Sequence, residues 1–82
     1  MTETIRTFVD FRIEEMKEHA NKRDYNPDKY PTSVYNTIID NAYQSGLGAV
    51  LYAHVFTKEV TDDEYTSLCS ELSSVHTEYR WR

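Results

Sequence analysis

The only two prolines in the chain, Pro27 and Pro31, separate two long stretches that have the periodicity of helices. A proline has no backbone N–H, and it pushes the residue before it into an extended conformation. No helix can therefore run through residues 26–31. A new element must begin after Pro31, where the hydroxyl of Thr32 or Ser33 is suited to cap a helix.

The stretch before the prolines predicts a helix over residues 3–23. Its apolar side chains recur every three or four residues along one stripe, and charged side chains lie opposite. The stripe consists of Ile5, Phe8, Val9, Ile13, Met16 and Ala20. Glu3 suits the positive end of the helix dipole, and Lys22 and Arg23 suit the negative end.

The end of the chain predicts a helix over residues 62–80. Thr61 followed by Glu64 three residues later is a capping box, in which each side chain binds the backbone N–H of the other residue. An apolar seam with helical spacing follows this start. It consists of Tyr65, Leu68, Cys69, Leu72, Val75, His76 and Tyr79.

The middle stretch predicts a helix over residues 33–57. Gly46 and Gly48 each cost about 1 kcal/mol inside a helix, so a break at 46–48 would divide it into two. A row of small residues on one side favours a continuous helix instead. This row is Ala42, Gly46, Ala49 and Ala53. The predicted fold is an all-α single domain over residues 1–82, a bundle of three helices, or four if the glycines break the second.

After Gly46 the middle helix loses its polar side. If the small residues face the other helices together with Tyr52 and Phe56, the opposite side exposes an apolar patch. That side comprises Leu47, Val50, Leu51, His54 and Val55. An apolar patch of a few hundred Å² is large for a stable monomer. We therefore expect a protein–protein interaction or regulatory module, with a second copy as the first choice of partner, another protein as the second, and the C-terminal segment as the third.

Two tyrosines flank the proline-containing segment. Because the prolines stiffen this segment, Tyr25 and Tyr30 could offer rigid aromatic surface to a partner. Alternatively, they could fold over the end of a thin core. Both interpretations are compatible with the sequence.

The net charge of −5 argues against direct binding to nucleic acid, which requires clustered Lys and Arg. Asp10, Glu14 and Glu18 form a row of carboxylates on one side of the first helix. The row suggests an alternative function, a small acidic inhibitor that covers a basic site on an enzyme or a nucleic-acid-binding protein. In size and charge the chain is similar to accessory proteins of phages and mobile elements.

No arrangement of residues indicates catalysis. The three histidines are not spaced to share a metal on one helix, and Cys69 and His76 lie two helical turns apart. We therefore expect no enzymatic activity, no metal and no cofactor. A single cysteine fits a reducing compartment, and the apolar stretch 46–56 is too short to span a membrane. These features lead us to expect a cytoplasmic protein.

Overall fold

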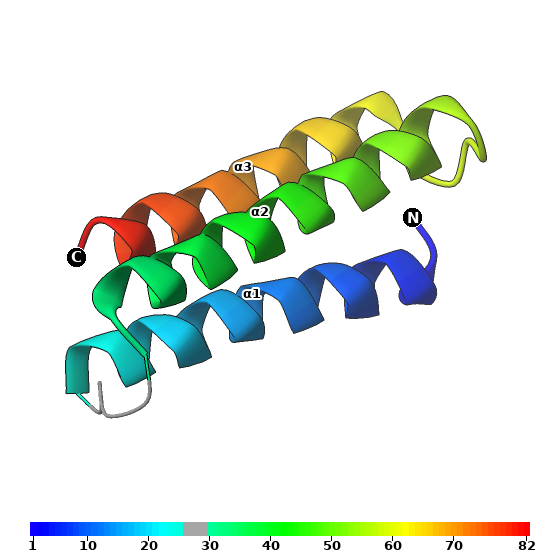
Figure 1. Ribbon diagram of the computed structural model, residues 1–82. Helices are drawn as coiled ribbons and strands as arrows, with labels where there is room; N and C mark the ends of the chain where they lie inside the picture. Colours follow the sequence, from blue (N-terminus) through cyan, green and yellow to red (C-terminus); the bar gives the residue numbers. More distant parts are fainter. Residues whose placement is uncertain (26–29) are drawn as a thin grey trace.

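The computed structural model describes residues 1–25 and 30–82 of the chain. Three helices, α1 (Glu3–Tyr25), α2 (Thr32–Val55) and α3 (Asp62–Arg80), pack side by side into a bundle about 42 Å long and 17 Å wide (Figure 1). No strand occurs in the described residues. The prediction of a small all-α helical bundle is confirmed.

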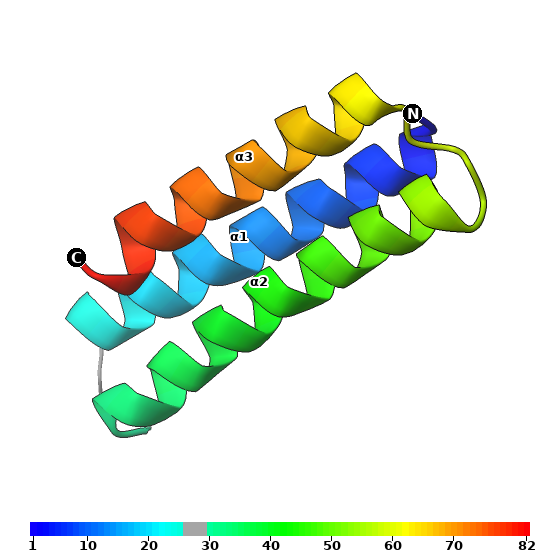
Figure 2. The same cartoon turned by 90° about the horizontal axis from the view of Figure 1, so that it is seen from above.

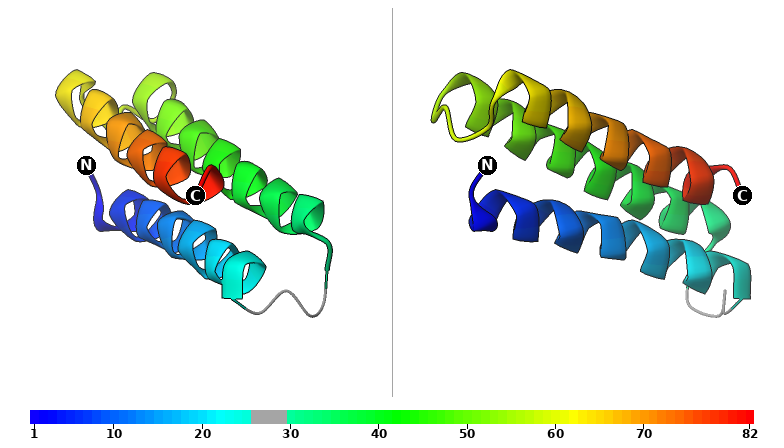
Figure 3. Two further views of the ribbon diagram at one scale, coloured as in Figure 1. Left: turned by 90° about the vertical axis from the view of Figure 1, so that its left-hand side faces the viewer. Right: turned by 180° about the vertical axis from the view of Figure 1, so that it is seen from behind.

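The helices alternate in direction, so α1 and α3 run parallel and α2 runs against both (Figure 2). The N-terminus consequently lies at the same end of the bundle as the loop between α2 and α3, and the C-terminus lies at the other end (Figure 3). The C-terminal segment with Trp81 is therefore remote from the C-terminal half of α2. It does not cover the apolar end of that helix.

Helix α2 is continuous through both glycines, so the break at 46–48 does not occur. A Cβ atom built on Gly46 would lie 2.9 Å from Leu72 Cδ2 and 3.6 Å from Arg12 Cβ. The missing side chain of Gly46 thus allows α1 and α3 to pack closely against α2. Gly48 has no such neighbour within 4 Å.

The helix limits lie within two residues of the predicted ones. Helix α1 ends at Tyr25, two residues later than expected, and α2 ends at Val55, two residues earlier. Phe56 caps α2, and Lys58 then adopts a positive φ of 63° in the loop. The predicted start of α3 is unchanged.

The capping box at the start of α3 is present. The Oγ1 atom of Thr61 accepts a hydrogen bond from the Glu64 N–H at 3.2 Å, and Glu64 Oε1 accepts one from the Thr61 N–H at 3.0 Å. The ammonium group of Met1 also donates to Glu64 at 2.9 Å. The hydrogen bonds from Met1 and from the Thr61 backbone lower the pKa of Glu64 to about 2.

The core runs along the axis of the bundle and draws on all three helices. Its members are Val9, Ile13, Met16, Ala20, Ile39, Ala42, Val50, Ala53, Val60, Leu68 and Leu72. The accessible surface of the chain is 5116 Å². A compact monomer of 9.7 kDa is expected to expose roughly 5100 Å². A single copy therefore closes around its own core.

Arg23 is a buried charged residue at the end of the bundle where α3 ends. Its guanidinium donates hydrogen bonds to the carbonyl oxygens of Tyr79 and Arg80 and to Asn36 Oδ1. Its pairing with Asp24 lowers the pKa of that carboxyl, with a smaller contribution from Arg82. The sequence suggested that Arg23 complements the dipole of its own helix, whereas it caps the last carbonyls of α3.

Candidate functional site

The outward side of α2 in its C-terminal half is uncharged. Gln44, Gly48, Leu51 and Val55 share this side at 100° per residue, and we call these four residues the α2 face. Leu51 is 47% exposed and Val55 is 43% exposed. No Asp, Glu, Lys or Arg occurs in the sequence between Asp40 and Lys58, and the polar side chain of this face is Gln44, at its N-terminal end.

Three residues that we expected on the exposed side of α2 are wholly or partly buried. The prediction was wrong for Val50, which is 0% exposed and belongs to the core. Leu47 is half-buried and packs against the core. Helix α2 contacts both α1 and α3, so its buried arc is wider than the row of small residues. The buried arc extends towards α3. Val50 lies on this side of α2, one turn after Gly46, which faces Leu72 of α3.

His54 is half-buried and fastens the end of α2 to the start of α3. Its Nδ1 atom lies 2.9 Å from the Val60 carbonyl oxygen, and its Nε2 atom lies 3.3 Å from Asp62 Oδ1. The imidazole ring stacks on Tyr65 with 4.7 Å between ring centroids. Both ring nitrogens therefore have partners within the chain, and the contacts of His54 organise the loop.

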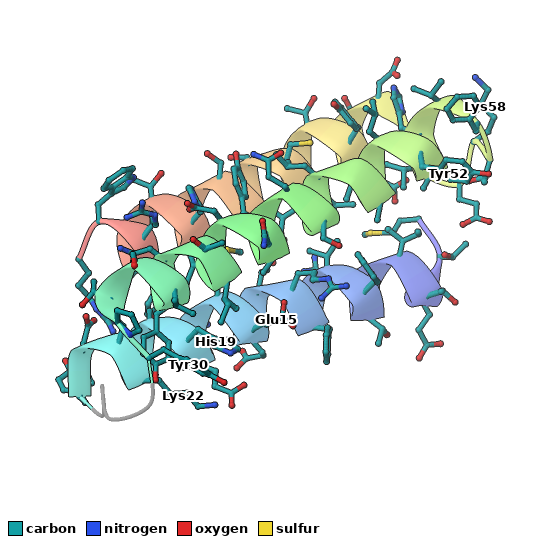
Figure 4. The ribbon with its side chains drawn as sticks, viewed as in Figure 1. Glu15, His19, Lys22, Tyr30, Tyr52 and Lys58 are labelled. Carbon is teal, nitrogen blue, oxygen red and sulfur yellow. The ribbon has the colours of Figure 1, made fainter. Side chains whose placement is uncertain are left out.

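Tyr52 and Phe56 do not face the other helices as we expected, because they are 59% and 70% exposed. Their rings lie 5.1 Å apart at the end of α2 beside the start of α1. Figure 4 shows Tyr52 and Lys58 at this end of the bundle. Tyr52 comes one residue before the buried Ala53, so at 100° per residue its ring lies at the edge of the helix pair and not between the helices.

A shallow groove of about 330 Å³ lies between α1 and α2 beside Tyr52. Its lining is mostly apolar: Thr4, Ile5, Phe8, Ala49, Tyr52, Ala53, Thr57 and Glu59. A second hollow of about 510 Å³ adjoins this one, since Thr4 and Phe8 line both. The second hollow extends to Glu3 and Phe11, and we call it the outer hollow and the first the inner hollow. We call the two hollows together the aromatic groove. The Arg12 guanidinium lies over the rings of Phe8 and Phe11, at 4.8 and 5.3 Å from their centroids.

Sequence reasoning missed the aromatic groove. Phe11 fell just outside the apolar stripe of the first helix, which was the available signal for an exposed aromatic side chain. The helix pattern does not show that the start of α1 lies beside the end of α2. That proximity follows from the antiparallel packing of the two helices.

Tyr25 and Tyr30 lie at the opposite end of the bundle from the α2 face. Tyr25 is largely exposed, with the Arg82 guanidinium 5.9 Å from its ring centroid. Tyr30 is exposed and contacts the buried Tyr35 edge-on at 5.7 Å. Residues 26–29, between the two tyrosines, lie outside the described part of the chain. The structure does not bring these tyrosines together with Leu51 and Val55.

The acidic row of α1 is paired with basic residues of the same helix. Asp10 pairs with Arg6, Glu14 with Lys17 at 3.8 Å, and Glu18 with Lys22 at 3.1 Å. Arg6 also binds Glu71 of α3 at 2.7 Å, and these two carboxylates, Glu71 foremost, raise the pKa of the guanidinium. Each carboxylate of the row therefore has a cationic neighbour on its own helix, which weakens the case for imitation of a phosphate backbone.

The polar cluster between α2 and α3 connects the two helices. Asp40 Oδ1 lies 2.8 Å from His76 Nε2 and accepts a hydrogen bond from Arg80 Nε at 2.9 Å. The imidazole of His76 stacks on Tyr43 at 4.2 Å. Among residues 1–25 and 30–82, no group of three or more His, Cys, Asp or Glu side chains is placed to hold a metal ion.

Within the same residues, each helix is too short or too polar to cross a membrane. Comparison with protein-family models, curated proteins and solved structures finds no match to this chain. Any inference about function therefore depends on the surfaces of the bundle described above.

Proposed function

We propose that the protein is a protein–protein interaction module that forms a homodimer through the α2 face. The observation that carries this proposal is the exposure of Leu51 and Val55 on a side of α2 that has no charged residue. The core of each copy is closed, so these side chains are not left over from an incomplete core. We infer that they serve contact with another molecule.

A second copy is the partner that the chemistry of this face favours. In a two-fold symmetric dimer the same surface patch of both copies is buried, so any charge on that patch would need a partner from the same patch of the other copy. The α2 face carries none. Gly48 at its centre has open space around it, which allows two α2 helices to approach closely in an antiparallel pair.

The single Cys69, which is half-buried and unpaired, fits a reducing compartment. We therefore propose a cytoplasmic location for this module. The acidic-inhibitor alternative has less support, because each carboxylate of the row on α1 already has a cationic neighbour.

The test is the molar mass of the protein in solution at tens of micromolar, measured by light scattering. We expect twice 9.7 kDa for the unmodified chain and 9.7 kDa for Leu51→Asp. Burying an unpaired carboxylate in the contact should raise the dimer dissociation constant at least about tenfold.

Thr37→Asp is the matched control. Thr37 is exposed on the same side of α2 but in its N-terminal half, so this variant should remain dimeric. Circular dichroism should show the same helix content for both variants. A monomeric unmodified protein, or equal weakening by the two aspartates, would contradict the proposal.

A further inference from the structure

We propose that the aromatic groove binds an amphipathic helix from a different protein, one that carries Lys or Arg along the edges of its apolar side. The smaller of its two hollows lies between α1 and α2, and no residue that lines either hollow belongs to the α2 face. This second surface therefore does not depend on dimer formation.

The shape and lining of the groove suit a helical partner. The smaller hollow lies between the start of α1 and the end of α2, and the larger one continues from it along α1, whose residues alone line it. Tyr52 on α2 and Phe8 and Phe11 on α1 line the hollows, and the ring of Phe56, the residue that caps α2, lies 5.1 Å from that of Tyr52. Aromatic side chains are enriched among the residues that dominate binding energy at protein interfaces. An amphipathic helix places its apolar residues into such a groove at spacings of three and four.

The free charges at the groove are negative. Glu3 lines the outer hollow and Glu59 lines the inner one, and neither forms an ion pair within residues 1–25 and 30–82. The basic residue at the groove is Arg12, which is held by Glu15 at 3.1 Å. Lys58 lines a separate hollow together with His54 and Val55.

Most of the other basic side chains that the structure describes are also engaged in ion pairs. Within the described residues, every Lys and Arg except Lys58 takes part in an ion pair. A second copy that used the same groove would bring the same two carboxylates to the contact, and among the described residues Lys58 is the one Lys or Arg that it could offer without breaking an ion pair. A basic partner satisfies both carboxylates, so charge complementarity favours it over self-association at this site.

The experiment uses synthetic helical peptides as probes. The first contains leucine and lysine in helical spacing, the second is a scrambled version of the same composition, and the third has glutamate in place of lysine. Fluorescence anisotropy measures binding to the full chain, and changes in amide NMR shifts locate it. We expect saturable binding of the first peptide alone, with shifts concentrated around Phe8, Phe11 and Tyr52.

Two variants with matched controls test the residues of the groove. Glu59→Lys should weaken binding of the first peptide about tenfold, whereas Glu78→Lys, an equal charge change near the end of α3, should leave it within about twofold. Phe11→Ser should weaken binding similarly, and Tyr25→Ser, which removes an exposed aromatic ring at the other end of the bundle, should not.

The proposal is overturned by any of three results: no saturable binding of the first peptide, equal binding of the scrambled peptide, or equal losses in the control variants. A fourth result would also overturn it: if the Phe11→Ser variant has a lower molar mass in solution than the unmodified protein, a second copy occupies the groove. The Leu51→Asp variant should bind the first peptide with unchanged affinity. The experiments therefore distinguish failure of the homodimer proposal from failure of the proposal that the groove binds a basic helix.

Discussion

Arg23 connects all three helices through one side chain. It extends from α1, binds Asn36 near the start of α2, and donates to the carbonyl oxygens of Tyr79 and Arg80 at the end of α3. These carbonyls have no partner within their own helix, because the last turn of a helix leaves four acceptors unpaired. Arg23 therefore supplies a tertiary cap for the end of α3.

Replacement of Arg23 by methionine keeps most of the length of the side chain and removes its donors. We expect a loss of about 2–4 kcal/mol in the free energy of unfolding, because Asn36, Asp24 and two backbone carbonyls lose a hydrogen-bond partner at a buried site. Urea denaturation followed by circular dichroism measures the loss. Lys22→Met is the control, since the surface pair of Lys22 with Glu18 should contribute less than about 1 kcal/mol. Equal effects of the two substitutions would contradict the role assigned to Arg23.

Within α2 the two glycines have different surroundings. Gly46 faces the fully buried Leu72, and Gly48 faces open space. Gly48→Ala should stabilise the helix by about 1 kcal/mol, which corresponds to a rise in Tm of roughly 4–8 °C for a chain of this size. Gly46→Ala gains the same helix propensity, but its new methyl group must displace Leu72 in a filled core. We expect no rise in Tm for Gly46→Ala.

Thermal melts in the Leu51→Asp background measure these effects without a contribution from association through the α2 face. A rise in Tm for Gly46→Ala equal to that for Gly48→Ala would show that Leu72 moves at little cost. Absence of a rise for Gly48→Ala would contradict a continuous α2.

The start of α3 depends on the ionisation of Glu64. In the folded chain its pKa falls from an ordinary value of 4.5 to about 2, because the carboxylate accepts hydrogen bonds from the Met1 ammonium and from Thr61. A lowered pKa means that this stabilisation is complete above about pH 4.5 and is lost as the pH falls towards 2. Glu64→Gln retains an acceptor for the cap but does not titrate.

We therefore expect the unmodified chain to be more stable than Glu64→Gln near neutral pH, with the difference shrinking between about pH 4.5 and 2. Thermal melts of both proteins across this range measure the difference, and the other carboxylates titrate alike in the pair. A difference that stays constant down to pH 2 would argue against the contacts of Glu64.

At the scale of the whole molecule, local patterns were sufficient for the helices but not for their faces. The prolines, the capping box of Thr61 and the apolar spacing depend on neighbours within a few residues, so the fold class and helix limits could be predicted. Which flank of α2 is covered depends on where α1 and α3 lie around it, and no local pattern encodes that arrangement. Val50, which we expected to be exposed, is consequently buried, and Tyr52, which we expected to face the other helices, is exposed. The aromatic groove was missed for the same reason.

Because the bundle has three helices that alternate in direction, the C-terminus lies at the opposite end of the 42 Å bundle from the N-terminus. Both surfaces that we assign to binding lie towards the other end, beside the N-terminus and the loop after α2. A fluorophore or a tether joined after Arg82 would therefore stand away from either surface. Protein anchored through that residue to a sensor chip should present its groove and its α2 face to the solution unobstructed.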